Sequence, residues 1–287
     1  MSEGFGAGWL ALREPFDAQA RDLSLALALA AALPPRPRLL DLGAGTGSLL
    51  RWLAPILGRS QHWTLVDADG ALLQQAFATI EERAALAGWT TTWPNSHTLL
   101  VHTPRGVWRV DALTADLAAG PAALPLDKAD AVVCTALCDL VSRPWVSAMA
   151  AALRVPFYAA LNVDGREGFF PPHPADRLVA RGFRRDQRRD KGFGPALGAD
   201  ATSALAAAFR ARGFTVRTAP SPWQVRANTP VMADQLAEGH AGAAASALPR
   251  SLGPDIEGWA KARRMQAMRG KLSARIGHKD LLALPDR

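Results

Sequence analysis

Apolar positions along the chain follow two different spacings. Five short segments are predicted to be strands: residues 38–42, 62–66, 129–135, 156–163 and 214–219, of which 129–135 is an apolar run of the buried type. Between them, apolar residues recur at helical spacing in four segments: residues 48–57, 70–87, 144–153 and 199–212. Alternation of buried strands with helices predicts an α/β fold, whose parallel sheet carries helices on both faces and is joined by right-handed crossovers.

Four further segments depart from this alternation. One amphipathic helix is predicted from Asp17 to Leu33, where two prolines end it. Residues 98–102 and 107–113, separated by a Pro-Arg-Gly turn, predict a β-hairpin. Residues 166–198 are rich in glycine, proline, aromatic residues and arginine, which is typical of an inserted cap.

The remaining C-terminal part is predicted to complete the sheet. Residues 199–287 form the second half of the core, with a mostly helical insertion at residues 221–270. The last strand candidate, residues 273–284, is interrupted by Gly277. We expect this strand to return antiparallel beside the preceding one.

Composition excludes several classes of protein. The chain has 287 residues, of which 49% are apolar, enough for one large core. No apolar run reaches the roughly 18 residues of a membrane span, and charged residues before the alanine-leucine segment argue against a signal peptide. The two cysteines, Cys134 and Cys138, exclude a disulfide framework and, without a nearby histidine, a convincing zinc site. We expect buried thiols in a cytoplasmic protein.

The net charge of +7 raises the possibility of a nucleic-acid partner. Arginine far outnumbers lysine in an alanine-rich chain, which indicates compositional bias, and no long run interleaves basic with aromatic residues. Two weaker basic clusters, residues 181–191 and 261–279, have three open interpretations: solvated helix faces, a site for an anionic substrate, or an RNA contact.

The first two strands frame the chemically most informative segment. The first ends at Asp41 and is followed by Gly43, Gly45 and Gly47; twenty residues after Gly47 the second ends at Asp67. Glycines in such a turn allow positive φ and let a ligand approach the backbone. The G-x-G-x-G spacing differs from the G-x-G-x-x-G of dinucleotide folds, and Asp41 would repel a pyrophosphate but suits a cationic ligand. Asp67 is placed to accept hydrogen bonds from ribose hydroxyls.

This pattern resembles the class I S-adenosylmethionine-dependent methyltransferases, whose first motif reads (D/E)-x-G-x-G-x-G. The resemblance implies one Rossmann-like domain over residues 1–287, with a mostly parallel sheet of seven strands in the order 3-2-1-4-5-7-6. It implies a core at residues 37–165 and an N-terminal helix, within residues 1–36, that acts as a lid. S-adenosylmethionine is the implied cofactor, its methionine end held by Asp41, Gly43, Ala44, Gly45 and Gly47, its ribose by Asp67 and the adjoining Ala68.

The resemblance extends to three later positions. Asp116 and Leu117 would hold the adenine, although Asp116 could instead cap a helix. Thr135 to Asp139 corresponds to the segment beside the sulfonium methyl, where Asp139 could act on a substrate or cap the next turn. In the N-terminal helix, Asp17 and Arg21 share a face and can pair, while Arg13 would meet the methionine carboxylate or an acidic substrate. A surface ion pair is the alternative for Arg13.

Methyl transfer requires an acceptor held in line with the sulfonium, and a base only where the acceptor is protonated. The candidate catalytic residues are therefore Asp139, His173 and Tyr158. Residues 169–174 are suited to a substrate wall, and residues 188–195 to a flexible lid. The sequence predicts transfer of a methyl group to a small molecule by in-line displacement, without naming the acceptor. Two alternatives are an RNA or protein methyltransferase and a non-methylating S-adenosylmethionine-binding protein.

Overall fold

The computed structural model describes residues 6–286 and contains one ten-stranded sheet. The strands lie in the order β3-β4-β5-β2-β1-β6-β7-β10-β8, and β9 pairs with β10 outside this path. Five neighbouring strands form the parallel part: β5 (Gly106–Thr114), β2 (Gln61–Asp67), β1 (Arg38–Leu42), β6 (Ala131–Thr135) and the first half of β7 (Phe157–Phe170). Because Leu42 lies opposite both Val66 and Cys134, these strands end along one carboxyl edge.

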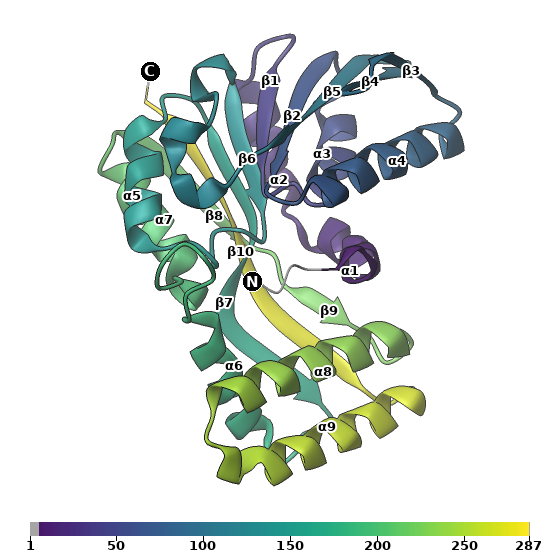
Figure 1. Ribbon diagram of the computed structural model, residues 1–287, viewed down its shortest axis with the longest axis vertical. Helices are drawn as coiled ribbons and strands as arrows, with labels where there is room; N and C mark the ends of the chain where they lie inside the picture. The colour runs from purple at the N-terminus through teal and green to yellow at the C-terminus, as the bar shows by residue number, and fades with distance from the viewer. Residues whose placement is uncertain (1–5, 287) are drawn as a thin grey trace.

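The antiparallel strands lie on both sides of this parallel part. A meander of β3 (Thr90–Asn95) and β4 (Thr98–Thr103) continues the sheet from β5. On the other side, β10 (Ser273–Pro285) runs antiparallel to β7, and β8 (Phe214–Pro220) and β9 (Trp223–Val225) pair with β10. The long β7 and β10 leave the main sheet together as a twisted ribbon (Figure 1).

Helices cover both faces of the sheet, as predicted. One face packs against α2 (Leu23–Ala32), α3 (Ser48–Leu57) and α4 (Gly70–Leu86), and the other against α5 (Arg143–Ala152) and α7 (Ala201–Arg210). Helix α1 (Ala7–Ala20) lies below the carboxyl edge (Figure 1). Short 3₁₀ turns occupy connections: Leu117–Ala119, Pro121–Ala123, Leu126–Lys128, Gly198–Asp200 and Arg250–Leu252.

A third hydrophobic core lies outside the main sheet. Its walls are the outer halves of β7 and β10, strand β9, and helices α6 (Asp176–Gln187), α8 (Pro230–Ala247) and α9 (Gly253–Met268). We call this part the extension. In Figure 1 it lies below the main sheet, and α8 and α9 cross the ribbon of β7 and β10. Phe169, Trp223 and Trp259 are buried in its centre.

Two predictions about the sheet are corrected, and one strand was missed. The sheet has ten strands instead of seven, so the order across it is not the predicted one. Without β3, β4 and β9, seven strands remain. When these seven are renumbered in chain order, they lie in the order 3-2-1-4-5-7-6. Residues 166–170 belong to β7 and not to a cap, because β10 pairs with them. The threonine-rich β3 was not predicted, since only pairing with β4 makes it a strand.

The predicted helix from Asp17 to Leu33 is in fact two helices, α1 and α2. The chain turns at Arg21, which has extended ψ, and Asp22 then caps α2 by accepting a hydrogen bond from Leu25 N at 2.9 Å. Asp22 N donates to the Asp280 carboxylate at 2.8 Å, which holds this break against the sheet. Residues 1–5 of the predicted lid lie outside the described residues. No helix within residues 6–286 is both long and apolar enough to cross a membrane.

Candidate cofactor site at the carboxyl edge

The glycine turn between β1 and α3 requires its glycines. Gly43, Gly45 and Gly47 have φ values of +65°, +52° and +77°, in the left-handed region that other residues avoid. A Cβ on Gly43 would lie 3.3 Å from Leu137 Cδ1, and one on Gly45 would lie 3.2 Å from Leu10 Cδ1. The turn is therefore covered closely by one leucine of α1 and one of the segment after β6.

Asp41, at the end of β1, is a buried acid without a partner. Its residue is 0% exposed, and neither carboxylate oxygen accepts a hydrogen bond from any residue in the described range 6–286. Burial raises the pKa of Asp41 to about 8, Arg21 opposes this, and Asp67 adds to it. A buried carboxylate of this kind is stabilised by a cationic ligand, since such a ligand supplies both the charge and the missing donors.

Arg21 lies beside Asp41 and was not predicted as a site residue. Its side chain is fully buried; Nη1 donates to Ser48 O at 3.4 Å, and Nη2 to Ser48 Oγ and Thr135 Oγ1 at 3.1 and 3.2 Å. Asp17 lies 3.9 Å away. Arg21 Nε finds no acceptor among the described residues. In the sequence, Arg21 was marked only by its i, i+4 spacing to Asp17. That spacing indicated an ion pair between the two residues and did not place Arg21 at the glycine turn.

Asp67 joins the end of β2 to the glycine turn. Its Oδ2 accepts a hydrogen bond from Gly45 N at 2.8 Å, and its Oδ1 accepts one from Asp69 N at 3.0 Å. A carboxylate oxygen can accept more than one hydrogen bond, so both oxygens retain capacity for ligand hydroxyls. The adjoining Ala68 is exposed at the same edge.

Asp116 and Leu117 follow β5 at the carboxyl edge. Asp116 is exposed and caps the 3₁₀ turn Leu117–Ala119, because its Oδ1 accepts a hydrogen bond from Ala118 N at 2.8 Å. Leu117 is buried, and its carbonyl accepts a hydrogen bond from Trp145 Nε1 at 2.8 Å. The capping interpretation of Asp116 thus describes its contacts, and an adenine-binding role remains a proposal.

The segment after β6 holds a second acid, Asp139, which is half-buried. Ala136 has φ +50°, which sharply turns the chain after Thr135. Asp139 Oδ1 is buried, and it accepts no hydrogen bond from residues 6–286. Burial raises the pKa of Asp139 to about 6, opposed by its own backbone N–H and then by Arg13. Ser142, not Asp139, caps α5.

Arg13 belongs to a buried network beneath this edge. Its Nε donates to Asp17 Oδ2 at 3.1 Å, and its guanidinium lies 4.7 Å from the centroid of the Trp223 ring. Trp223 Nε1 donates to Asp17 Oδ1 at 3.0 Å. The predicted ion pair of Arg13 therefore exists, but it is largely buried instead of lying on the surface. It ties α1 to β9.

Two of the three predicted catalytic side chains contact other parts of the chain. Tyr158 is fully buried in the sheet, where its hydroxyl donates to Asp280 Oδ2 at 3.3 Å. Burial, and then the nearby Asp280 charge, raise the pKa of Tyr158 well above its ordinary value. His173 precedes α6 in the extension, and its backbone N–H donates to Asp176. Among the three, Asp139 follows β6, which ends beside β1, and the catalytic roles of Tyr158 and His173 stay predictions.

The two basic clusters lie mainly on the helices of the extension and contact acids. The ion pairs join Arg184 to Glu167, Arg188 to Asp200, Arg189 and Lys191 to Asp186, Arg263 to Asp176, and Arg264 to Asp234 and Glu238. Most of these arginines are more than half exposed, whereas Arg263 is fully buried. These contacts favour the interpretation of solvated helix faces for most of both clusters.

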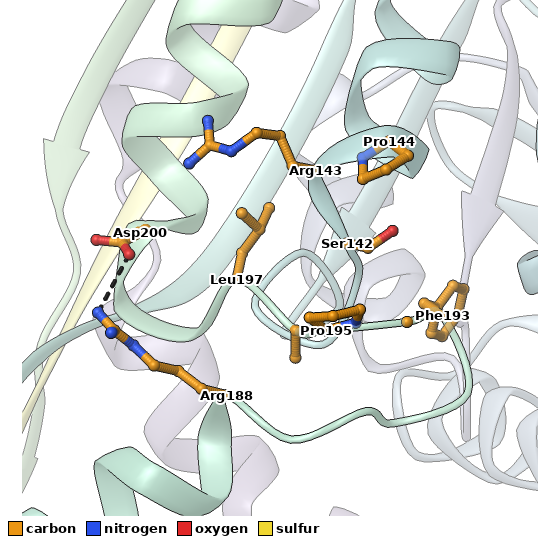
Figure 2. A pocket seen from close by; sticks show the side chains of 10 residues that line it. Ser142, Arg143, Pro144, Arg188, Phe193, Pro195, Leu197 and Asp200 are labelled. Atoms are coloured by element: carbon orange, nitrogen blue, oxygen red, sulfur yellow. Dashed lines mark hydrogen bonds and ion pairs between the residues drawn. The ribbon is translucent and has the colours of Figure 1, made fainter.

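A cavity of about 620 Å³ lies beside the segment that carries Asp139. Figure 2 shows its walls, formed by the start of α5 at Ser142 and by the loop from Arg188 to Leu197. The loop is held by hydrogen bonds from Leu197 N to Val141 O at 2.9 Å and from Gly198 N to Asp139 O at 2.8 Å. Arg143 and Arg188 both line the cavity, and Arg188 pairs with Asp200 (Figure 2).

No family model and no curated protein matches the chain. Among solved structures, S-adenosylmethionine-dependent methyltransferases from Thiobacillus denitrificans and Geobacter sulfurreducens, both with S-adenosylhomocysteine, are similar at 14% and 16% identity and TM-scores of 0.45 and 0.43. The match to the Thiobacillus protein covers 98% of this chain and 99% of that protein. The match to the Geobacter protein covers 96% of this chain and 98% of that protein. The cyclopropane synthase MmaA2 from Mycobacterium tuberculosis is similar at 13% identity and a TM-score of 0.44, over 91% of this chain and 82% of the synthase.

Proposed function

We propose that this chain binds S-adenosylmethionine at the carboxyl edge and transfers its methyl group to a small-molecule acceptor. The observation that carries this proposal is Asp41, a fully buried carboxylate without a partner in the described range, placed directly before a three-glycine turn. A cationic group on a ligand satisfies this carboxylate, whereas a pyrophosphate would be repelled by it.

The surrounding residues fit the separate groups of that cofactor. Asp41 would hold the ammonium, and Arg21 the carboxylate, because its buried guanidinium has an Nε–H free of any acceptor within residues 6–286. Asp67 would accept hydrogen bonds from the ribose hydroxyls. Asp116 and Leu117 would contact the adenine. Arg21 replaces Arg13 in this assignment, since Arg13 is already bound to Asp17.

The cofactor supplies an electrophilic methyl group, and the chain supplies position and exclusion of water. Leu10 and Leu137 lie over the glycine turn and cover part of it, so that Gly43 and Gly45 are half-buried. Asp139 would accept a proton from an acceptor that is protonated at neutral pH; the pKa of about 6 leaves its carboxyl ionised and able to do so.

A small acceptor is supported by the cavity next to the segment that carries Asp139, although Asp139 itself does not line it. Its volume of about 620 Å³ is in the range of sites for small molecules. Arg143 in its wall favours an acceptor that carries an anionic group, whereas Arg188 is already paired with Asp200. The loop from Arg188 to Leu197 would then act as the predicted lid.

Calorimetric titration with S-adenosylhomocysteine tests the cofactor site without knowledge of the acceptor. Asp67→Ala should weaken binding about 10-fold or more, because ribose hydroxyls lose a charged acceptor. The affinity of Asp67→Asn, whose side chain can still accept a hydrogen bond from Gly45 N, should lie between those of Asp67→Ala and the wild type. Asp69→Asn is the matched control: it changes the neighbouring acid, which caps α4, and should leave affinity unchanged. Equal affinity of Asp67→Ala and wild type would refute the proposed site.

A further inference from the structure

A second cavity, of about 500 Å³, lies on the opposite face of the sheet from the first. It is bounded by α1, α3, α4 and the starts of β3 and β5; Figure 1 shows α3 and α4 above α1. Three tryptophans, Trp52, Trp89 and Trp108, line it together with Pro15, Pro55 and Ile80. Aromatic walls on several sides favour a planar apolar ligand, which can stack on them.

One of these tryptophans carries a hydrogen-bond donor without a partner. Trp108 is only 5% exposed, and its indole Nε1–H meets no acceptor anywhere in the described part of the chain. Trp89 packs edge-on against it, with 5.1 Å between ring centroids. Buried indole N–H groups are normally satisfied, and since this nitrogen has no exposed surface, a ligand acceptor would reach it only when the Trp108 ring turns towards the cavity.

The charged residues around the cavity favour an anion. Its lining includes one acid, Glu14, and two arginines, Arg51 and Arg83. Glu14 is bound to Arg51 by two hydrogen bonds of 2.5 and 2.8 Å. Arg83, in the last turn of α4, is exposed at the cavity. We propose that this cavity binds a small aromatic carboxylate, whose ring stacks on the tryptophans and whose carboxylate meets Arg83 and the Trp108 N–H.

The same cavity contacts the glycine turn. Arg51 donates to Thr46 O inside the turn, and Trp52 lies beneath the Arg21 guanidinium at 5.5 Å. A ligand that presses on Arg51 and Trp52 therefore shifts the groups assigned to the cofactor. This coupling rests on the proposed function, whereas binding of the aromatic carboxylate does not.

Binding is tested by calorimetric titration with 1-naphthoate, with 1-naphthylmethanol as the neutral counterpart. We expect 1-naphthoate to bind with a Kd of about 1 mM or tighter and the alcohol at least fivefold more weakly. Trp108→Phe, which keeps a ring and removes the N–H, should weaken naphthoate binding about fivefold or more, and so should the surface change Arg83→Gln. Trp93→Phe, which removes an exposed indole outside the cavity, is the control and should change nothing. Failure of naphthoate to bind, or wild-type affinity in both Trp108→Phe and Arg83→Gln, overturns the proposal.

The coupling has two readouts. Saturating 1-naphthoate should change the affinity for S-adenosylhomocysteine about threefold or more, and it should alter amide hydrogen exchange at residues 43–47. Unchanged exchange with unchanged affinity refutes the coupling. If S-adenosylhomocysteine does not bind at all, the proposed function fails, and the exchange readout still decides whether the cavity acts on the turn.

Discussion

The carboxyl edge of the sheet and the junction of β7, β10 and α2 each bury an aspartate completely, and they treat it differently. At the edge, neither oxygen of Asp41 accepts a hydrogen bond from residues 6–286. At the junction, Asp280 accepts hydrogen bonds from Asp22 N and Leu161 N, both at 2.8 Å, and from the Tyr158 hydroxyl at 3.3 Å.

This difference separates a structural acid from one suited to a ligand. Asp280 binds three chain segments together, and its contact with Leu161 N holds that residue at φ +56°, a strained value for leucine. The Asp41 carboxyl accepts no hydrogen bond from another segment in residues 6–286, although burial of an unpartnered carboxyl is unfavourable. A fold that keeps such a group retains it for something that the chain alone does not supply.

The largest effect is expected at the structural acid. Asp280→Ala should lower the free energy of unfolding by about 3–5 kcal/mol, because it leaves the buried donors Asp22 N and Leu161 N without an acceptor. Urea denaturation followed by circular dichroism measures this. Asp200→Ala, which removes an exposed pair with Arg188, is the control and should stay within about 1 kcal/mol of wild type. A loss no larger than that of the control would contradict the structural role.

Asp41→Asn should instead raise the free energy of unfolding relative to the wild type as the pH rises. The pKa of Asp41 is about 8 in the folded chain against an ordinary value of 3.8, so between these pH values the folded state keeps a proton that the unfolded state loses. The wild-type free energy of unfolding should therefore fall by about 1.4 kcal/mol per pH unit from this group alone as the pH rises. Asparagine does not titrate, so the variant should gain that much on the wild type between pH 6 and 7.

Denaturant titrations of both proteins at pH 6 and pH 7 give this difference directly. The same variant should bind S-adenosylhomocysteine about 10-fold more weakly or worse, because the ammonium loses the counter-charge that Asp41 provides once it releases its proton on binding. A variant that is both less stable at pH 7 and unchanged in affinity would place Asp41 with Asp280 as a structural acid, and the comparison would fail.

The sequence predicted the edge well because its signals are local. The bounds of β1 and α3 agree with the structure, since an apolar run, a three-glycine turn and the αL cap at Gly58 all lie within a few residues of them. The second acid could be placed because β2 is parallel to β1 and ends beside it. The positions of groups that lie on consecutive short elements can therefore be predicted from the sequence.

The junction and the extension depend on contacts between distant residues. Residues 165–170 contain two glycines and charged residues, and they form a strand only because β10, more than 100 positions later, pairs with them. Arg21 reaches Ser48 and Thr135 only because the chain breaks between α1 and α2, and that break depends on Asp280. Helical periodicity continued across this break, which explains the incorrect single helix.

The smallest effect is expected for Tyr158→Phe, which separates the two aspartates most sharply. The hydroxyl gives Asp280 its longest hydrogen bond, at 3.3 Å, and Asp22 N and Leu161 N remain as donors. The free energy of unfolding should fall by about 1 kcal/mol. The affinity for S-adenosylhomocysteine should stay within about twofold of wild type, because Tyr158 is buried in the sheet and its hydroxyl is directed to Asp280. A tenfold loss of affinity with unchanged stability would return Tyr158 to the active site, and it would show that Asp280 also acts on the ligand.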